Sequence, residues 1–526
     1  MTAPFALAGP LAAVGLVALA GCAAAALAWP SPGGRALGRI GALVLAPALL
    51  LAQVASSSSL AALTRRPVLL GAGLAVALAA LALLARTLSR HPEGVPALAV
   101  LALPFRIPIH VGGVTANLLV PLYVVVAAGT LAELAPMMRA RRRAPEQNGP
   151  PEPRPFTERA PGWLERLLGA SVVLYALQAA YSSDPTKALQ QEVFFYAPFA
   201  LLFVLLARHR WDARQLGRCL YALIALCVLF GGLGLYEWTT KTLIFNPRLL
   251  VSNDFHAYFR VNSFFFDPNI YGRFLAIVML VVLAGMLYAS RRRVILAAGV
   301  LLAALWGSLL LTLSQSSLAA LLFGLGVLAA LRWSVRGALT VAGGLVVVGV
   351  VAILLFPSAL GLSLSSSRTL NDATSGRVQL IDGGVRLFAA RPLIGWGSAS
   401  FAREYRRREG AHSGAQAVSA SHTIPITVAA EQGVLGLALY LVLLAVAVSR
   451  LGRGAGRTPA RAAIAAAFLG LVLHTVTYAD FLEDPLTWTL LAAGTSLAAL
   501  EGERGRGGRA RAPARQRTDA LPALGG

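Results

Sequence analysis

The chain has 526 residues, of which 57% are hydrophobic and 13% are charged. Soluble domains carry about a quarter charged residues, so this composition excludes an ordinary soluble protein. The net charge is +23, but the arginines gather in clusters at the ends of apolar runs. That pattern is typical of the cytoplasmic loops of membrane proteins and argues against a nucleic-acid-binding surface.

Apolar runs of nearly membrane-spanning length recur along the whole chain. They predict an all-α polytopic membrane protein with about 12–14 transmembrane helices and a large extracytoplasmic loop, since each crossing needs about 20 residues. The expected spans are 6–29, 37–55, 67–86, 111–133, 163–182, 190–207, 216–238, 269–289, 294–313, 315–331, 337–356, 424–449, 462–480 and 485–500. Placing both termini in the cytoplasm puts the main arginine clusters inside. Segment 95–109 contains three prolines and is expected to be a short or re-entrant piece on the outer side.

Shifts in composition divide the chain into parts. We expect N-terminal transmembrane helices at 1–136, a basic, proline-rich cytoplasmic linker at 137–161, central transmembrane helices at 162–356 with an outer loop at 239–268, a large extracytoplasmic loop at 357–422, C-terminal transmembrane helices at 423–500, and a disordered basic cytoplasmic tail at 501–526. The loop at 357–422 holds WGSASF and several aromatic residues. A loop of that length with such residues is expected to fold.

Arginines on the two outer loops go against the orientation bias. Arg260 precedes one span, and Arg377, Arg386 and Arg391 lie along SGRVQLIDGGVRLFAARPLIGWG. Guanidinium groups bind phosphate oxygens in bidentate fashion and stay charged, so we expect these four residues to bind an anionic ligand that carries phosphate. The alternatives are an interfacial role for Arg260 and a solvated, arginine-rich loop for the others. Asp267 and Pro268 are expected to cap the next helix.

His422 lies just before Pro425, at the predicted start of a long apolar helix. The positive end of a helix dipole disfavours imidazolium and leaves a neutral ring that accepts a proton. The same helix start can bind phosphate through its free N–H groups. His422 is therefore the candidate catalytic base, and its alternative role is that of a capping or interfacial histidine.

Three further ionisable residues fall within or beside spans and are possible supporting residues: Glu431, His474 and Asp480. Charge at membrane depth is costly and is therefore a functional candidate by default. The acids near Asp480 could also simply cap a turn. The sequence has no CxxC, HExxH or GxxxxGK[ST] pattern in a suitable context, so neither a metal nor a cofactor is predicted.

Several of these runs together resemble the O-antigen ligase and O-antigen polymerase-like family of integral membrane glycosyltransferases. They are FRVNSFFFDPNIYG, SGRVQLIDGGVRLFAARPLIGWGSASF, SHTIPITVAAEQGVLGLALYL and the closing LHTVTYADFLEDP. The resemblance covers roughly residues 190–500. It implies metal-independent transfer of a glycan from an undecaprenyl-diphosphate carrier to an acceptor hydroxyl. Arg260 and Arg377 would hold the diphosphate, and His422 would be the base or orient the acceptor.

The predicted function is therefore a glycosyltransferase of cell-surface polysaccharide biosynthesis in the cytoplasmic (inner) membrane, with its active site facing the extracytoplasmic side. Its expected partners are the undecaprenyl-diphosphate-linked glycan donor, a glycan or lipid acceptor and membrane lipids, with no nucleic acid. The alternative is a transporter or flippase of lipid-linked glycans, with Glu431, His474 and the arginines along its path. A transporter would carry internal repeats and broken helices. An inactive scaffold is a third possibility.

Overall fold

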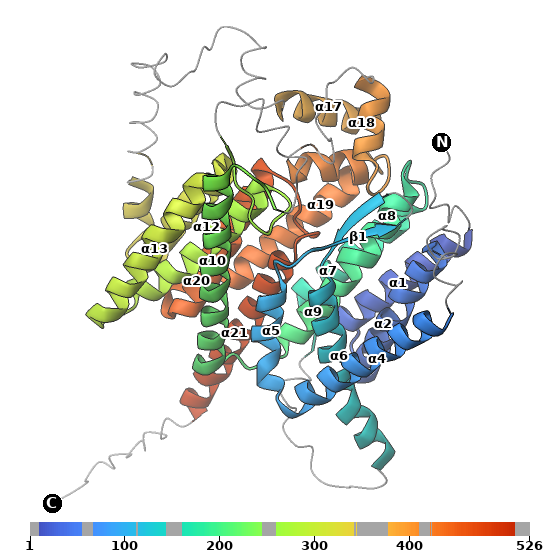
Figure 1. Ribbon diagram of the computed structural model, residues 1–526, viewed down its shortest axis with the longest axis horizontal. Coiled ribbons are helices and arrows are strands. Elements are labelled where there is room, and N and C mark those ends of the chain that lie inside the picture. Colours follow the sequence, from blue (N-terminus) through green and yellow to red (C-terminus); the bar gives the residue numbers. More distant parts are fainter. Residues whose placement is uncertain are drawn as a thin grey trace, which may run out of the picture.

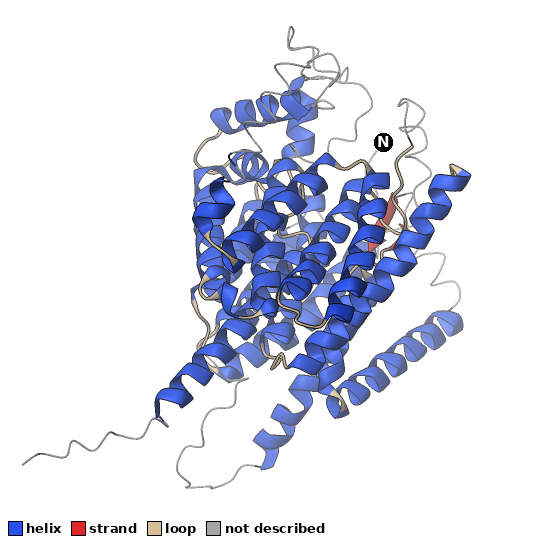
Figure 2. Ribbon diagram, turned by 90° about the vertical axis from the view of Figure 1, so that its left-hand side faces the viewer, coloured by secondary structure: helices blue, strands red, loops and turns tan. Residues whose placement is uncertain are grey.

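The computed structural model describes residues 10–54, 67–111, 114–143, 160–244, 259–340, 343, 377–409, 421 and 423–510. These residues form a bundle of long helices (Figure 1). A short antiparallel hairpin of β1 (Ile107–Val111) and β2 (Val114–Leu118) lies beside the helices (Figure 2). Within the described residues, ten helices are long and apolar enough to cross a membrane. The predicted class, an all-α polytopic membrane protein, is confirmed.

The helices begin and end close to the predicted spans. In chain order they are α1 (Pro10–Ala28), α2 (Pro32–Val54), α4 (Pro67–Arg90), η1 (Pro92–Gly94), α5 (Val95–Ala102), α6 (Val120–Arg143), α7 (Trp163–Ala179), α8 (Pro185–Gln191), the π-helical turn η3 (Glu192–Tyr196), α9 (Ala197–Ala207), α10 (Ala213–Thr240), α12 (Pro268–Leu287), α13 (Arg292–Thr312), α14 (Gln315–Arg332), α17 (Arg377–Ala390), α18 (Phe401–Glu409), α19 (Ile424–Gly452), η4 (Ala455–Arg457), α20 (Pro459–Thr477) and α21 (Pro485–Ala510). The expected span at 337–356 lies largely outside the described residues.

Prolines set many of the helix starts, because a proline in the first turn gives up an N–H that has no partner there. Pro268 opens α12 in this way, directly after its cap Asp267. The Asp267 carboxylate accepts the backbone N–H of Asn269 at 2.6 Å. The predicted capping role of Asp267 and Pro268 is confirmed.

The helices pack as two groups that the C-terminal helices join. In one group α1 packs against α2, α7 and α9, and in the other α12 packs against α13, α14 and α20. Helix α20 also contacts α19 and α21, and α21 lies along α9. α17 and α18 lie beyond the start of α19 at one end of the bundle (Figure 1). We call this the α17 end, and the opposite end, where α1 and α9 finish, the arginine end.

Between α4 and α6 the chain turns back from the arginine end. α4 ends at the arginine end, where the backbone of Pro92 hydrogen-bonds His209. α6 also runs toward that end, since its Glu133 pairs with Arg39 near the start of α2. The segment between them includes α5, which packs against α6 and α10.

Segment 95–109 contains the short helix α5 and the start of β1. Pro96 occupies a first-turn position that helices tolerate. The predicted placement of this segment on the outer side stays a prediction. The first described residue, Pro10, lies at the opposite end from the end of α21, so the described termini do not share a side (Figure 1).

The buried carboxylate of Glu237 holds the end of α10 to the chain that leads into α12. It accepts backbone N–H groups from Ile244 at 3.2 Å, Asn262 at 3.1 Å and Ser263 at 2.7 Å. A buried N–H that loses its acceptor costs free energy of unfolding. The glutamate therefore fixes the entry to the helix that carries Asn269.

Glu237→Ala should destabilise the protein by about 2 kcal/mol or more, since three backbone donors lose their acceptor at once. Thermal unfolding of the purified protein in detergent should show a Tm lower by several degrees. Glu93→Ala is the control, because Glu93 is exposed and pairs with an exposed His91. An unchanged Tm for Glu237→Ala would show that these three bonds are dispensable.

Candidate functional site

The turn Pro392–Gly397 docks against a break in α19. Gly433, inside this helix, has φ +68° and ψ −165°, so the helical hydrogen-bond ladder is interrupted there. The turn satisfies the backbone groups at the break. Val434 N donates to Pro392 O at 2.7 Å, and Gly397 N donates to Glu431 O at 2.8 Å. Two sequence motifs that lie far apart along the chain therefore form one unit.

Glycines make this close docking possible. A Cβ on Gly395 would collide with the backbone of Glu431, and one on Gly433 would collide with the Leu393 carbonyl. Both glycines, and Gly397 as well, have positive φ angles that side-chain-bearing residues rarely adopt. The glycine spacing in PLIGWG and EQG thus follows from backbone contact across the break.

Glu431 holds the chain that follows the turn. Its Oε2 accepts the backbone N–H of Ala399 at 2.9 Å, and its Oε1 accepts that of Phe401 at 3.0 Å. The side chain is buried, and both of its oxygens face backbone donors. Glu431 therefore acts in the described structure by positioning the start of α18, a role for which a carboxylate with two acceptors is well suited.

The end of α7 fixes the same turn from a third direction. Ser182 Oγ donates to Ser398 O at 2.7 Å, and Ser398 Oγ donates to Tyr175 O at 2.7 Å. Gln178 Nε2 donates to Gln432 O at 3.2 Å, directly before the break at Gly433. The turn is consequently tied to both α7 and α19, which leaves little freedom at the point where they meet.

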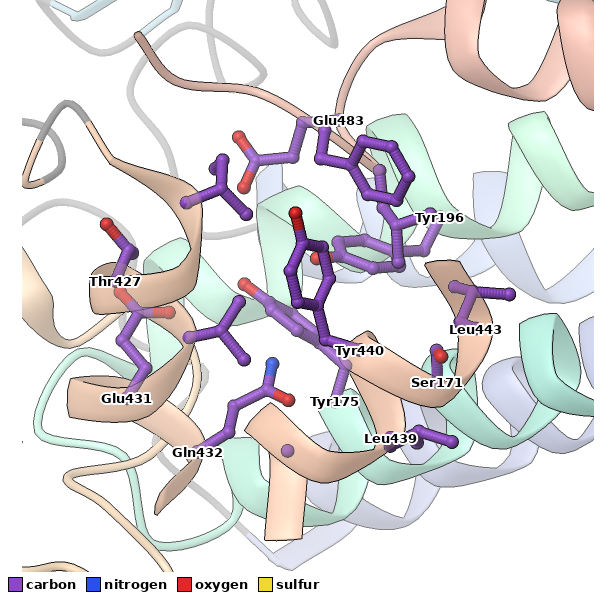
Figure 3. Close-up of a pocket in the computed structure, with 15 residues that line it drawn as sticks. Ser171, Tyr175, Tyr196, Thr427, Glu431, Gln432, Leu439, Tyr440, Leu443 and Glu483 are labelled. Carbon is purple, nitrogen blue, oxygen red and sulfur yellow. The ribbon is translucent and has the colours of Figure 1, made fainter. Parts of the chain in front are cut away.

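A pocket of about 60 Å³ lies next to Glu431. In Figure 3 the rings of Tyr175, Tyr196 and Tyr440 surround the same space that the Glu483 carboxyl faces. The Tyr175 and Tyr196 rings are stacked with centroids 4.3 Å apart. Its lining residues are Ser171, Tyr175, Tyr196, Ile424, Thr427, Val428, Glu431, Gln432, Gly436, Leu439, Tyr440, Leu443, Phe481, Leu482 and Glu483. This mixture of aromatic faces and a few polar groups suits the hydroxyl-bearing edge of an organic ligand.

The surroundings of Glu483 favour the protonated form of its carboxyl group, because they raise its pKa. Burial raises the pKa of Glu483 to about 8, and the neighbouring Asp480 carboxylate acts in the same direction. The positive charges of Lys187 and Arg106 oppose this effect. A carboxyl that titrates near neutral pH is able to exchange a proton with a ligand in the pocket.

A second polar group lies where α12, α14 and α20 meet, and it contains Arg260. The guanidinium donates from Nε to Thr312 O at 3.0 Å and from Nη2 to Asn269 Oδ1 at 3.2 Å. Ser314 Oγ donates to the same Asn269 oxygen at 2.8 Å. The Oγ of Ser317 lies 3.2 Å from Nε2 of His474, which is fully buried. The chain of contacts fixes the orientation of Arg260.

The loop from Tyr478 to Asp484 connects the two polar groups. Arg273 Nη2 pairs with Asp484 Oδ2 at 2.7 Å, and both side chains are buried. Asp484 Oδ1 also accepts Leu486 N at 2.8 Å and caps α21. Removing one member of a buried ion pair costs about 3–5 kcal/mol, so this pair anchors the loop that carries Glu483 into the pocket.

Two of the predicted arginines, Arg386 and Arg391, have contacts of their own near α17. Arg386 forms an ion pair with Asp382 on the exposed side of α17. The Arg391 guanidinium lies 4.0 Å from the ring centre of Trp396, and Arg408 lies 4.6 Å from the same ring. These described contacts do not join Arg260 to Arg386 or Arg391.

Two predicted residues are described little or not at all. Arg377 begins α17, and its side chain lies outside the described part. His422 also lies outside the described residues, between Ser421 and the cap of α19, Thr423. The predicted helix start just after His422 is confirmed, because α19 begins at Ile424.

The other supporting candidates have different environments. His474 is buried within the Arg260 group and packs against Tyr478 with ring centres 5.5 Å apart. Asp480 has φ +70° in the tight loop, and its charge acts on Glu483. Both lie in or beside the part of the chain that connects the two polar groups.

Sequence reasoning missed several residues of this site. Arg273 could have been predicted from the sequence, because an arginine inside an apolar span needs a partner. Tyr175, Tyr196 and Tyr440 carried none, since tyrosines in spans are common and their convergence depends on how α7, η3 and α19 pack.

These features define a polytopic α-helical membrane protein. Its Arg260 group and its tyrosine-lined pocket lie toward the α17 end of the bundle. Residues 300–441 match the family model described as O-antigen ligase, which confirms the resemblance and supports an O-antigen ligase-like family for this chain. The matched region begins within α13 and ends past the middle of α19. It supports an O-antigen ligase- or polymerase-like function in polysaccharide biosynthesis. A comparison with curated proteins finds no match.

Gly433→Ala should destabilise the α19 break, because alanine is strained at φ +68° and its Cβ meets the Leu393 carbonyl. We expect a loss of about 1–3 kcal/mol, seen as a lower Tm and faster proteolysis near residues 392–401. Gly452→Ala, at the far end of the same helix, meets no atom within 4 Å and is the matched control. Equal Tm values for the two variants would contradict the docking of the turn.

The raised pKa of Glu483 predicts a pH-dependent stability. Because the folded pKa is about 8 and the unfolded value is about 4.3, the folded state binds more protons between these values. Stability then falls as pH rises through this window. Tm measured from pH 5 to pH 9 should decline more for the wild type than for Glu483→Gln. Parallel curves for the two proteins would show that Glu483 titrates normally.

Proposed function

We propose that this protein transfers a glycan from undecaprenyl diphosphate to an acceptor hydroxyl in cell-surface polysaccharide biosynthesis. The observation that carries the proposal is the position of the family match. Residues 300–441 include Thr312, Ser314 and Ser317 of the Arg260 group, and they include the turn, the break and Glu431 of the pocket. The matched region therefore contributes to both polar groups.

In the proposed reaction the acceptor oxygen attacks the anomeric carbon of the donor sugar. The bond from that carbon to the diphosphate oxygen breaks, and the acceptor proton passes to a base, for which we propose His422. Negative charge grows on the leaving diphosphate, and guanidinium groups stabilise it. We propose Arg260 and Arg377 for this role, with Arg386 and Arg391 as further phosphate contacts.

Arg260 is the best described of these residues. Two of its donors are fixed by Thr312 and Asn269, so the plane of the guanidinium is set before a ligand arrives. Preorganised donors stabilise developing charge without reorganisation during the reaction. We assign His474 to this group as a positioning residue, because it lies within hydrogen-bonding distance of the serines that support Asn269.

We propose that the acceptor binds in the pocket next to Glu431. Its small volume suits a hydroxyl-bearing edge rather than a whole glycan. In this proposal Glu431 positions the wall of the pocket through Ala399 and Phe401, whereas Glu483 faces the acceptor directly.

The proposed location is the cytoplasmic membrane, with the α17 end on the extracytoplasmic side. Arg208, Arg292, Arg332 and Arg450 lie at the starts or ends of helices at the opposite end of the bundle. Arginine enrichment marks the cytoplasmic side, which supports the proposed orientation.

One structural observation favours the alternative function, a transporter or flippase of lipid-linked glycans. A broken helix is typical of transporter binding sites, and α19 is broken at Gly433. The break, however, lies close to the start of α19, and its backbone groups are bonded to the docked turn. The glycosyltransferase therefore remains the first proposal.

The test is transfer by the purified protein from an undecaprenyl-diphosphate-linked glycan in proteoliposomes. His422→Ala, Arg260→Ala and Arg377→Ala should each lower the rate by about 100-fold or more, with Arg260→Lys only partly active. Arg293→Ala is the matched control, since Arg293 is exposed at the start of α13.

Full activity in the three alanine variants would overturn the site. A wild type that moves the lipid across the bilayer without consuming it would support the transporter instead.

A further inference from the structure

A second cavity, of about 70 Å³, lies at the arginine end, far from the candidate site. It is formed by the end of α1, the start of α2, the start of α7, the end of α9 and the late part of α21. The residues that line it are Ala26, Leu27, Arg35, Ala160, Pro161, Glu165, Phe203, Val204, Ala207, Arg208, Thr495, Ser496 and Ala499.

This end of the bundle carries an excess of positive charge. Arg35, which is buried, donates from Nη1 to Trp29 O at 3.0 Å and to Pro30 O at 3.1 Å, so its head is fixed at the wall of the cavity. Arg208 lines the same cavity. The carboxylate in the lining, Glu165, accepts the backbone N–H of Gly162 at 2.9 Å and caps its own helix.

A neighbouring ion pair does not cancel this charge. Arg39 Nη1 pairs with Glu133 Oε2 at 2.9 Å behind the cavity. Glu133 also attracts Arg208. Among the charged side chains described around the cavity, Arg35, Arg39 and Arg208 outnumber Glu133 and Glu165 by one. Two of these guanidinium groups, those of Arg35 and Arg208, line the cavity.

A buried hydroxyl in the cavity supplies an independent sign of a ligand. Thr495 is only 7% exposed, and its Oγ1 has no hydrogen-bond partner within the described part of the chain. Most buried hydroxyls in proteins are paired. An acceptor oxygen placed between Thr495 and the two guanidinium groups would satisfy this donor.

We propose that this cavity binds a phosphate group, supplied by the headgroup of an anionic phospholipid in the adjacent leaflet. Guanidinium groups and a hydroxyl are the donors that phosphate oxygens prefer. The cavity lies at the ends of three candidate spans, those that include α1, α2 and α9. Basic pockets between spanning helices on the cytoplasmic side bind anionic lipid headgroups. Phe203, Val204 and Leu27 supply apolar walls beside the charged groups.

A ligand bound in this cavity would contact α7 and α21 near the arginine end. The same two helices lead to the candidate functional site at their other ends. Helix α7 carries Tyr175 and ends at the docked turn, and α21 follows the loop that carries Glu483. The proposed phosphate site rests on the cavity at the arginine end and does not depend on the proposed transferase reaction.

The experiment measures Tm of the delipidated, purified full-length protein in detergent. The ligands are short-chain phosphatidylglycerol, phosphatidylcholine with the same chains, and inorganic phosphate. Phosphatidylglycerol should raise the Tm of the wild type in a saturable way, and phosphatidylcholine should not. Arg208→Gln should weaken the apparent affinity by about fivefold, since one arginine near anionic lipid is worth about 1 kcal/mol.

Arg210→Gln, two residues away and outside the cavity lining, is the matched control and should bind as the wild type does. Because the loss of Arg208 could also loosen the fold, Ala499→Phe supplies a second variant that fills the cavity and keeps its charge. It should abolish the phosphatidylglycerol response.

Equal phosphatidylglycerol responses in the wild type, Arg208→Gln and Ala499→Phe would overturn the site. So would a wild type that responds to none of the three ligands. A response of the same variants to inorganic phosphate, with none to phosphatidylglycerol, would keep the phosphate site and overturn its lipid source.

Discussion

The contact between the Pro392–Gly397 turn and the break at Gly433 is the constraint on which the candidate site depends. Two glycine-bearing backbones meet there without intervening side chains, and Glu431 then fixes Ala399 and Phe401 with its two oxygens. Everything that lines the pocket from α19 is placed by this contact. Gly395, Gly433 and Glu431 therefore have a structural role, because they contact backbone groups. They position the side chains around them.

A buried ion pair has a comparable role on the other side of the site. Arg273 and Asp484 join α12 to the loop before α21, and this loop carries Glu483 toward the pocket and Tyr478 toward His474. Taking two charges out of water is expensive. Once both charges are buried, losing either partner leaves the other uncompensated, so the pair ties this loop to α12.

The two ends of the bundle differ in how they use arginine. At the α17 end, Arg260 is oriented by Thr312 and Asn269 within a hydrogen-bonded cluster, whereas Arg391 lies over Trp396. At the arginine end, Arg35 and Arg208 line a cavity, and other arginines lie at helix ends. The same residue type is thus held in oriented side-chain contacts at one end and lines a cavity and helix ends at the other.

The sequence by itself determined the membrane class, most helix boundaries and the helix start after His422, because these depend on local hydropathy and capping. It also indicated Arg260, Glu431 and His474, since charge is rare in apolar surroundings. Its prolines indicated that segment 95–109 is not one long span, and the helix described there, α5, has eight residues. Only the tertiary structure decided that Arg260 and Arg391 have different partners, that Glu431 binds backbone N–H groups, and that three tyrosines share a pocket with Glu483. Those relations depend on contacts between helices distant in sequence, which local pattern does not encode.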